Sequence, residues 1–365
     1  MHGAEGFGHP AVAAAELANL SAAVPAPVMP VRSLGTVPPC LIVNPLSFRA
    51  SQGGLAGRAI ALARRHGAQV IEAVEPADVF AAMEQLRARR QPRVFVLSGD
   101  GTVQGIVQYL ALLPAQEWEP ELLVLGGGRS NVTARDFGGV PAYAKLEAAL
   151  RGSSEGRPMG VELHQLLRIE QEGSTPQHGF LLAAAMIDSG IRLCRRHRKS
   201  GHGWIHTGPL SDAYTLGRLA LQVLTGRSPL PPFPQMRIDA VATPPATGPT
   251  TAASQSLQGP IRVLVATTLR HAEGLYNPYA ARGEGSVRVT AVAATAPRFW
   301  RRLPKILTGR FDEHMDSSQG YLSGRFDHVV LLGLGHYSLD GEAFETDATR
   351  PVFIRGGAHL RVLKP

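Results

Sequence analysis

The five residues SGDGT at Ser98–Thr102 combine small, turn-forming side chains with one ionisable carboxyl group. They follow the apolar run Val94–Leu97 and precede an apolar-periodic segment, a pattern that predicts a turn between a strand and a helix. Such a turn favours phosphate because its backbone N–H groups and the positive end of the helix dipole converge there. Gly99 and Gly101 lack a Cβ atom and would let a phosphate or nucleotide come close.

Asp100, in the middle of this turn, does not suit a simple anion site because its charge would repel phosphate. Its presence indicates a second duty: holding a metal-bound water, orienting a substrate hydroxyl or binding a ribose. The alternative is an ordinary Asp-Gly turn in which Thr102 caps the following helix. Thr102 could also reach an anion.

Two more turns of small residues follow apolar runs. The turn NPLS at Asn44–Ser47 comes after Cys40–Val43, and GGGRSN at Gly126–Asn131 ends the run Glu121–Gly127. In a parallel α/β sheet, ligands bind beyond the carboxyl ends of the strands. The three turns are therefore expected to converge on one crevice.

Alternating strands and helices with short connectors surround these turns, which predicts a mostly parallel, three-layer α/β sheet. Strands are expected at Cys40–Val43, Ala68–Val74, Arg93–Leu97 and Glu121–Gly127, and helices at Leu55–Gly67, Pro76–Arg90, Thr102–Leu113, Asn131–Phe137 and Pro141–Leu150.

After about residue 158 the pattern becomes mainly strand-like, with helical signals only at Gly208–Thr225 and Ala296–Leu307. The low-complexity segment Ala242–Gly259 predicts a mobile loop. We therefore expect three parts, which are a flexible extension over 1–38, an α/β domain over 39–157 and a β-rich, sandwich-like domain over 158–365.

The chain has 365 residues and a formal net charge of +8, which favours anionic partners. No nucleic-acid-binding module is apparent, so phosphorylated small molecules and an acidic membrane surface remain. Cations cluster at Arg195–Lys199 and at Arg298–Lys305. The second cluster interleaves Phe299 and Trp300 with its cations, a mixture suited to a membrane interface, whereas the alternative is a solvated basic face.

No apolar run approaches the roughly 20 residues that span a bilayer. The first residues lack the basic region of a signal peptide, and the two cysteines, Cys40 and Cys194, lie far apart. These features predict a cytoplasmic protein that associates with membranes peripherally. They do not predict its oligomeric state.

These motifs resemble those of the diacylglycerol kinase and sphingosine kinase-like lipid kinases. SGDGT resembles their GGDGT signature, of which NAD kinases and phosphofructokinases use a similar version, and NPLS resembles their NP-x-S/A-G motif. The segment Leu125–Gly138 resembles their PxGTxN(D/M)xA motif, and LDGEAF at Leu339–Phe344 resembles their (V/L)DGE motif. The segment Asn277–Val292 resembles the strand before it. The ordered matches run from about residue 39 to 365.

The resemblance implies a nucleotide-binding α/β domain like that of phosphofructokinases and NAD kinases, followed by a β-rich lipid-substrate domain. It further implies that ATP binds between the domains with Mg²⁺, and that the γ-phosphate moves to a hydroxyl of diacylglycerol or a related sphingoid lipid. By match to the motifs, the nucleotide site would include Asn44, Ser98, Gly99, Gly101, Thr102, Gly128, Arg129 and Asn131.

The same resemblance assigns catalytic roles to Asp340 and Glu342, which would close on this crevice from the second domain. Bacterial relatives imply Asp340 as the general base and sphingosine kinases imply Asp100, so the choice between them stays open. Glu284 stands where relatives have an Asp linked to Mg²⁺. Asp188 stands near residues that contact the lipid headgroup, unless it caps the helix that follows.

Two departures from the family pattern bear on activity. Arg129 replaces a Thr, and it could either pair with phosphate or fill the nucleotide pocket. Gln104 and Gly105 replace an acid that relatives have after the GGDGT turn. These departures support an alternative function as a non-catalytic lipid- or nucleotide-binding protein on the same fold. A soluble metabolite kinase of NAD-kinase type is a third alternative.

Overall fold

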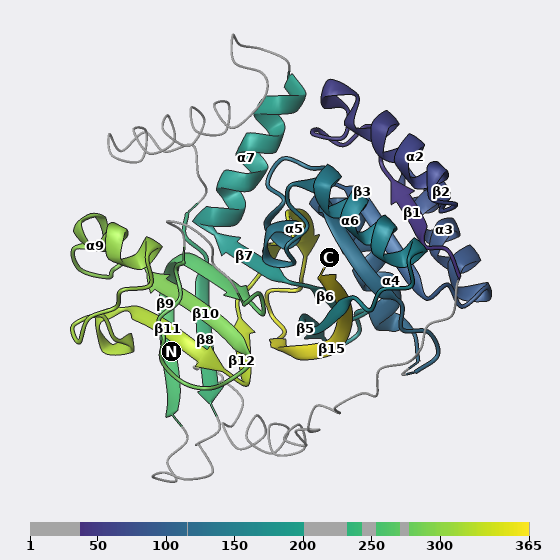
Figure 1. The fold of residues 1–365 in the computed structure, drawn as a ribbon. Helices are drawn as coiled ribbons and strands as arrows, with labels where there is room; N and C mark the ends of the chain where they lie inside the picture. Colours follow the sequence, from purple (N-terminus) through teal and green to yellow (C-terminus); the bar gives the residue numbers. More distant parts are fainter. Residues whose placement is uncertain (1–36, 115, 201–231, 243–252, 271–276, 365) are drawn as a thin grey trace, which may run out of the picture. The chain divides into compact units, whose positions relative to one another are not determined.

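The computed structural model describes residues 37–114, 116–200, 232–242, 253–270 and 277–364 (Figure 1). Residues Thr36–Pro365 form one compact unit. Nearly all of the expected extension over 1–38 lies outside the described residues, as does the helix expected at Gly208–Thr225. The side chains of the basic cluster Arg195–Lys199 lie outside them too.

The first part of the chain forms a parallel sheet in the order β4-β3-β1-β2. Val43 pairs with Leu97, and Ser98 pairs with Gly126, so three strands end at the same edge of the sheet. The turns after these strands leave from that edge. The strands are β1 (Cys40–Val43), β2 (Gln69–Glu72), β3 (Arg93–Ser98) and β4 (Glu121–Gly126).

Helices cover both faces of this sheet, because successive residues of each buried strand point to opposite faces. Ile42 and Val96 pack in one core with α3 and α4, whereas Leu41 and Leu97 pack in a second core with α2 and α6. The predicted three-layer arrangement is confirmed. The helices are α2 (Leu55–Arg65), α3 (Pro76–Ala88), α4 (Asp100–Leu112), α5 (Val132–Asp136) and α6 (Ala142–Ser154), with a 3-10 turn η1 (Gln52–Gly54) before α2.

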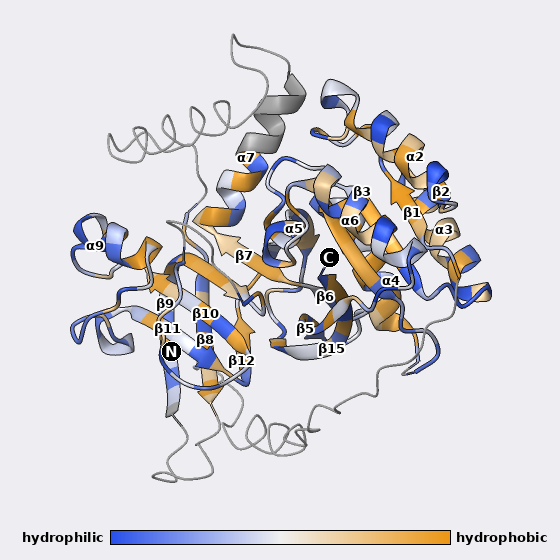
Figure 2. Ribbon diagram, viewed as in Figure 1, coloured by the Kyte–Doolittle hydropathy of each residue, from blue (hydrophilic) through white to orange (hydrophobic). Residues whose placement is uncertain are grey.

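Local signals explain where these helices begin and how they lie. Pro76 opens α3, and Glu75 and Asp78 form a reciprocal capping box at its start. Figure 2 shows β1 and β3 as hydrophobic, whereas α2 and α6 alternate between hydrophobic and hydrophilic residues. The helices are therefore amphipathic, with one face on the sheet.

The second part is antiparallel apart from the pairing of its last strand with β4, and it surrounds its own core of β-strand residues. The sequence predicts a β-rich region here, and the strand content of this part confirms it. Its strands are β5 (Gly160–Gln171), β6 (Gln177–Gly179), β7 (Leu181–Ala185), β8 (Gln235–Ala242), β9 (Ala253–Thr267), β10 (Val287–Ala293), β11 (Tyr321–Phe326), β12 (His328–Leu332), β13 (His336–Leu339), β14 (Glu342–Glu345) and β15 (Val352–Lys364), with helices α7 (Met186–Ser200) and α9 (Phe299–Leu307) and a 3-10 turn η2 (Ser317–Gln319).

The last strand joins the two regions into one sheet. β15 pairs parallel with β4, antiparallel with β5 and antiparallel with β12. Arg361 lies opposite Glu121 of β4, and Nη2 of Arg361 donates a hydrogen bond of 3.3 Å to Oε1 of Glu121. The end of the chain therefore returns to the sheet that carries the three turns.

One predicted loop is wrong over part of its length. The segment expected to be a mobile loop at Ala242–Gly259 includes the first residues of β9, which pair antiparallel with β8 from Ala253 onward. Ladder hydrogen bonds to β8 stabilise this stretch despite its small, polar composition. Within the described part of the chain, no helix is long and apolar enough to span a bilayer.

Candidate active site

Hydrogen bonds join the three turns at the carboxyl edge of the parallel sheet. The backbone N–H of Gly99 donates to Oγ of Ser47 at 3.0 Å, which links the SGDGT turn to the NPLS turn. Nδ2 of Asn44 donates to Oγ1 of Thr102 at 3.4 Å, a second link between the same turns. The N–H of Gly127 donates to the carbonyl of Ser98 at 3.0 Å, which adds the GGGRSN turn.

Close backbone packing explains part of the glycine content. A Cβ atom on Gly128 would lie 2.7 Å from Cα of Gly99, and a Cβ atom on Gly127 would lie 2.8 Å from the backbone nitrogen of Ser98. A Cβ atom on Gly99 would meet its neighbours only at ordinary distances, the nearest being 3.6 Å. Gly127 and Gly128 are thus required for the two turns to touch, whereas Gly99 is not.

Asn131 closes the GGGRSN turn on itself. The residue is buried and adopts a left-handed conformation with φ of 51° at the start of α5. Its Oδ1 accepts from the N–H of Gly128 at 2.7 Å, and its Nδ2 donates to the carbonyl of Gly128 at 2.9 Å. Both ends of the amide therefore hold the loop, so the side chain of Asn131 shapes this turn from within.

Asp100 is the first residue of α4, and its carboxylate accepts a hydrogen bond from Oγ of Ser130. Burial raises the pKa of Asp100 above its usual value, and the hydrogen bond from Ser130 opposes that rise. Gly99 is the N-cap residue, and no side chain caps this helix. The interpretation of Thr102 as the cap is therefore wrong, since Thr102 lies inside the first turn of α4.

Asp340 occupies a two-residue hairpin turn between β13 and β14. Asp340 and Gly341 have φ values of 49° and 83°, and Leu339 pairs with Glu342, the geometry of a type I′ turn. The DG dipeptide suits this turn because it tolerates two positive φ values. The turn aims the Asp340 carboxylate back at the segment between β6 and β7.

Backbone donors hold the Asp340 carboxylate. The N–H of Phe180 lies 3.0 Å from Oδ2, and the N–H of Leu181 lies 2.9 Å from Oδ1. Burial of the carboxyl group is nevertheless the larger effect, and it raises the pKa of Asp340 to about 7. The charge of Asp100 raises the pKa of Asp340 further, so the two acids repel each other.

Glu342 brings the second region against the SGDGT turn. A Cβ atom on Gly101 would lie 2.7 Å from Oε1 of Glu342, so the Glu342 carboxylate rests where that Cβ would be. The DGE turn and the SGDGT turn, about 240 residues apart in sequence, are therefore in contact. This contact places Glu342 beside the helix start that carries Asp100, whose charge also acts on Asp340.

Asp188 lies in the first turn of α7 and is buried. Its Oδ1 accepts from Oγ of Ser338, and its Oδ2 accepts from Nε of Arg192 at 2.8 Å. The alternative that Asp188 caps the helix is wrong, because the residue lies within α7 and its carboxylate binds side chains. Ser338 precedes Asp340 by two residues, so Asp188 supports the strand that carries the DGE turn.

Two arginines near the site are among those whose buried donors have no hydrogen-bond partner within the described residues. Nη1 of Arg129 is one of them, and the Arg129 guanidinium stacks 3.8 Å from the centre of the Phe48 ring. Nη2 of Arg192 is the other. Unpaired buried donors are costly, so an oxygen acceptor from a ligand would stabilise either group.

Glu284 lies in the exposed segment before β10. Its neighbours Gly283 and Gly285 pack against the backbone of Arg325 and Phe326 in β11. Over the described residues, no three His, Cys, Asp or Glu side chains gather closely enough to cage a metal ion. The assignment of Glu284 to a metal stays a prediction.

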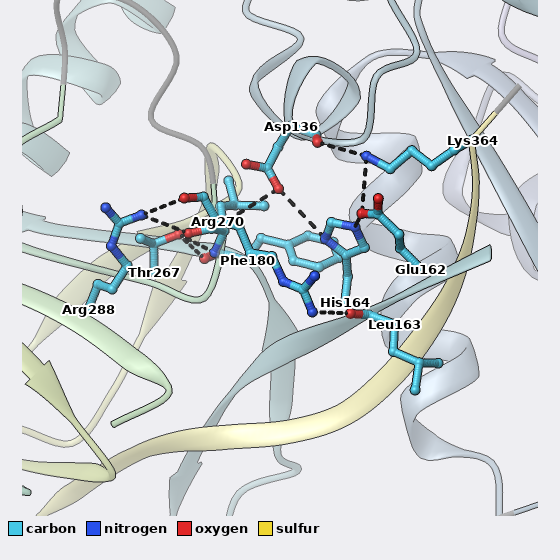
Figure 3. A network of polar contacts seen from close by, with 10 residues as sticks. Asp136, Glu162, Leu163, His164, Phe180, Thr267, Arg270, Arg288 and Lys364 are labelled. Carbon is cyan, nitrogen blue, oxygen red and sulfur yellow. Dashed lines mark hydrogen bonds and ion pairs between the residues drawn. The ribbon is translucent and has the colours of Figure 1, made fainter. Parts of the chain in front are cut away.

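A polar network around the buried side chains of Asp136 and His164 fixes the far end of α5 (Figure 3). Oδ2 of Asp136 lies 3.7 Å from Nδ1 of His164, and Nε2 of His164 lies 3.3 Å from Oε2 of Glu162. Lys364 of β15 contacts Glu162 at 3.4 Å and donates to the carbonyl of Asp136 at 3.3 Å. Figure 3 also shows Nη2 of Arg270 donating to the carbonyl of Leu163, at 2.6 Å. The network anchors the helix that Asn131 starts.

Sequence reasoning missed five residues around the site. Ser47 and Ser130 lie inside turns that the sequence already marked as candidate sites. Their hydroxyl groups could have identified them as hydrogen-bonding residues of those turns. Phe48, Arg192 and Ser338 act through tertiary contacts, for which a single sequence gives no signal.

Comparison with known proteins agrees with this geometry. Residues 38–165, which include the three turns, match the family model described as diacylglycerol kinase catalytic domain. No protein with a curated description matches the chain.

Solved structures share the fold over most of its length. A diacylglycerol kinase from Bacillus anthracis str. Sterne is 15% identical with a TM-score of 0.55, and the match covers 90% of this chain and 96% of that one. Two provisionally assigned diacylglycerol kinases from the same organism are 14% and 16% identical, with TM-scores of 0.59 and 0.56. These matches cover 90% of this chain and 96% and 98% of the other two. The resemblance is confirmed: residues 38–165 match the diacylglycerol kinase catalytic domain model, and the chain shares its fold with these bacterial proteins.

Proposed function

We propose that this protein is an ATP-dependent lipid kinase that transfers a phosphoryl group to a hydroxyl of diacylglycerol. The observation that carries the proposal is the contact between the DGE turn and the SGDGT turn, where Glu342 lies against Gly101. A phosphate-binding turn and a second acidic turn are what phosphoryl transfer to a hydroxyl requires, because the reaction depends on positioning and charge neutralisation.

The residues present fit a nucleotide. Gly128 and Gly99 pack their backbones together, which leaves a turn without side chains, and Nη1 of Arg129 has no hydrogen-bond partner in the part of the chain that the structure describes. Ser98, Gly99, Gly101, Thr102 and Gly128 would form the phosphate cradle, with Asn44, Arg129 and Asn131 supporting it. Bound ATP would supply the phosphoryl group, and Mg²⁺ would neutralise its oxygens.

The acids fit a magnesium ion held by one or two carboxylates together with phosphate and water, which is the usual magnesium shell. Asp100 and Glu342 are the two acids that flank Gly101, and we assign them to this ion. Asp100 begins α4 and is held by Ser130, so its carboxylate is fixed in orientation.

Asp340 is the general base in this proposal. A base works best when its pKa lies near the working pH, and burial raises the pKa of Asp340 to about 7. The N–H groups of Phe180 and Leu181 hold the carboxylate in one orientation. Asp340 would accept the proton of the lipid hydroxyl, whereas Asp100, at the start of α4, would hold the magnesium ion.

The acceptor is a neutral lipid in this proposal. Asp188 is the acid predicted to contact the headgroup. Its charge is neutralised by Arg192, whose Nε lies 2.8 Å from Oδ2 of Asp188. A sphingoid base carries an ammonium group, which would seek an uncompensated carboxylate. Nη2 of Arg192 instead offers a donor for an ester or hydroxyl oxygen, as diacylglycerol has. Because such a lipid lies in a membrane, we expect a cytoplasmic protein that associates peripherally with anionic bilayers.

The test is a transfer assay with purified protein, labelled ATP, Mg²⁺ and lipids dispersed in detergent micelles. We expect labelled product from diacylglycerol, less from monoacylglycerol and little from sphingosine. Asp340→Asn should abolish transfer, whereas Asp347→Asn, which changes an acid outside the site, should not. Absence of transfer to every lipid, beside a working control kinase, would refute the proposal.

The residues at two positions of the site favour a second, non-catalytic function. The Arg129 guanidinium is stacked on Phe48 inside the expected nucleotide turn, and Gln104 stands where relatives carry an acid. A non-catalytic lipid-binding protein would have both features. Calorimetric titration with ATP and Mg²⁺ separates the two functions, because binding of the nucleotide supports the kinase and its absence supports the alternative.

A further inference from the structure

The helix α9 combines a buried face with an exposed face of unusual composition. Phe299 and Ile306, seven residues apart, are buried in the core of the β region. Trp300 and Leu307 each follow one of these residues, about 100° further around the helix, and they are 43% and 37% exposed. The buried residues fix the helix on the β region, so the exposed apolar side chains keep a defined position on the surface.

Cations flank this apolar strip. Arg298 and Arg301 are exposed, and neither forms an ion pair with any residue that the structure describes. Lys305 in the next turn is paired with Asp312 at 2.7 Å, so it contributes less free charge. Arg302 lies over the Tyr321 ring at 5.2 Å, packed against the protein. The free positive charge is therefore concentrated at the start of α9.

A pocket of about 400 Å³ opens at this start. Arg262 joins Arg298 and Arg301 in its lining, together with Ala296 and the rings of Phe299 and Trp300, and none of the lining residues is acidic. Nη2 of Arg262 donates to the carbonyl of Ala294 at 2.8 Å. Its guanidinium also stacks over Phe299 at 4.4 Å, so Arg262 is fixed in place.

The chemistry of this surface selects its partner. Three arginines around a pocket attract a phosphate group, and an exposed Trp beside them suits the boundary between headgroups and acyl chains. A soluble phosphate compound would use the arginines but would gain nothing from Trp300 and Leu307. An anionic bilayer uses both features, since it presents phosphates and apolar chains together.

The topology connects this surface to the lipid site. Arg262 of β9 is adjacent to Val263, and Val263 pairs with Ala185, the residue immediately before α7. The first turn of α7 carries Asp188. A bilayer held by α9 would therefore lie at the end of the sheet where α7 begins.

We propose that the exposed face of α9 and the arginine-lined pocket at its start form a docking surface for anionic phospholipid bilayers. The headgroup phosphate enters the pocket between Arg262, Arg298 and Arg301, and Trp300 enters the interface. The proposal does not depend on phosphoryl transfer, because the protein can bind the bilayer without catalysing any reaction.

The test is sedimentation of the full chain with phosphatidylcholine vesicles that contain or lack phosphatidylglycerol, without ATP. We expect binding only to the vesicles with phosphatidylglycerol, and weaker binding at high salt. Arg298→Ala and Arg301→Ala should each lower the partition coefficient about fivefold. Trp300→Ala should lower it severalfold at either salt concentration.

The matched control is Arg64→Ala combined with Arg65→Ala, which removes two exposed charges from α2 and should not change binding. Circular dichroism establishes that each variant is folded. Equal losses in the control and in a variant that combines Arg298→Ala with Arg301→Ala would show that net charge alone binds the vesicles, which would overturn the proposal.

Two further results would also overturn it. The first is release from the vesicles by inorganic phosphate together with no effect of Trp300→Ala, which would indicate a site for a soluble anion. The second is tighter binding to a short DNA duplex than to the vesicles through the same arginines, which would assign the surface to nucleic acid.

Discussion

Replacing Asp340 by Asn should change how stability depends on pH. The pKa of this carboxyl group rises from 3.8 to about 7 because the group is buried. The rise corresponds to on the order of 4 kcal/mol between its two protonation states. This figure is an upper estimate for the effect on folding, because part of the residue stays exposed.

The sign follows from proton binding in the two states. Between pH 3.8 and about 7 the folded protein keeps the proton on Asp340, whereas the unfolded chain has already lost it. Stability contributed by this group is therefore fully present at low pH and falls as the pH rises towards 7. Above about pH 7 both states are ionised and the loss is constant.

The Asn variant lacks this dependence, since its amide resembles the protonated acid. The free energy of unfolding of the variant should exceed that of the wild type by about 1.5 kcal/mol at about pH 5 and by about 4 kcal/mol at about pH 8, both as upper estimates, because the unfolded wild-type chain already ionises above pH 3.8. Urea unfolding followed by circular dichroism at both pH values measures the difference.

Asp347→Asn is the matched control. Hydrogen bonds from Thr349 lower the pKa of the exposed Asp347, so its contribution changes only below its ordinary pKa of 3.8. Its effect should be the same at about pH 5 and about pH 8. A variant at Asp340 that is less stable than the wild type by equal amounts at both pH values would refute the assignment of a buried, raised-pKa carboxyl group.

Three other substitutions test the site. Gly101→Ala should lower the turnover number about tenfold or more with little change in Tm, because the new Cβ displaces the Glu342 carboxylate, whereas Gly99→Ala meets only ordinary contacts and should have a smaller effect. Arg129→Thr should raise the Kd for ATP about tenfold by calorimetry if the arginine pairs with phosphate; tighter binding would show that it fills the pocket. Arg192→Ala should raise the ratio of sphingosine to diacylglycerol phosphorylation by leaving its partner carboxylate uncompensated, and an unchanged ratio in the transfer assay would contradict that role.

The parallel part of the fold was predictable because its signals are local. Apolar runs such as Val94–Leu97 alternate with amphipathic segments, and the turn residues after each run mark the strand ends. Parallel pairing then brings those ends to one edge, so the neighbourhood of SGDGT and GGGRSN followed from the pattern.

The remaining parts depend on contacts that no local pattern encodes. β15 escaped prediction because Gly356 and Gly357 interrupt its alternation, yet the strand pairs with three others. The Asp188 carboxylate looked like a helix cap, because nothing in the sequence shows that Ser338 and Arg192 reach it. The helix expected to begin at Thr102 begins two residues earlier, at Asp100, with Gly99 as its N-cap.

The central claim is that Asp340 accepts the proton of a lipid hydroxyl at a nucleotide site. The most direct measurement is a single-turnover assay of labelled phosphate transfer from ATP to diacylglycerol across pH, with the wild type and Asp340→Asn. The account predicts a wild-type rate that rises with pH and levels off above about pH 7, and no transfer by the variant although it still binds ATP. Wild-type rates by Asp340→Asn, or no transfer by the wild-type protein at any pH, would contradict it.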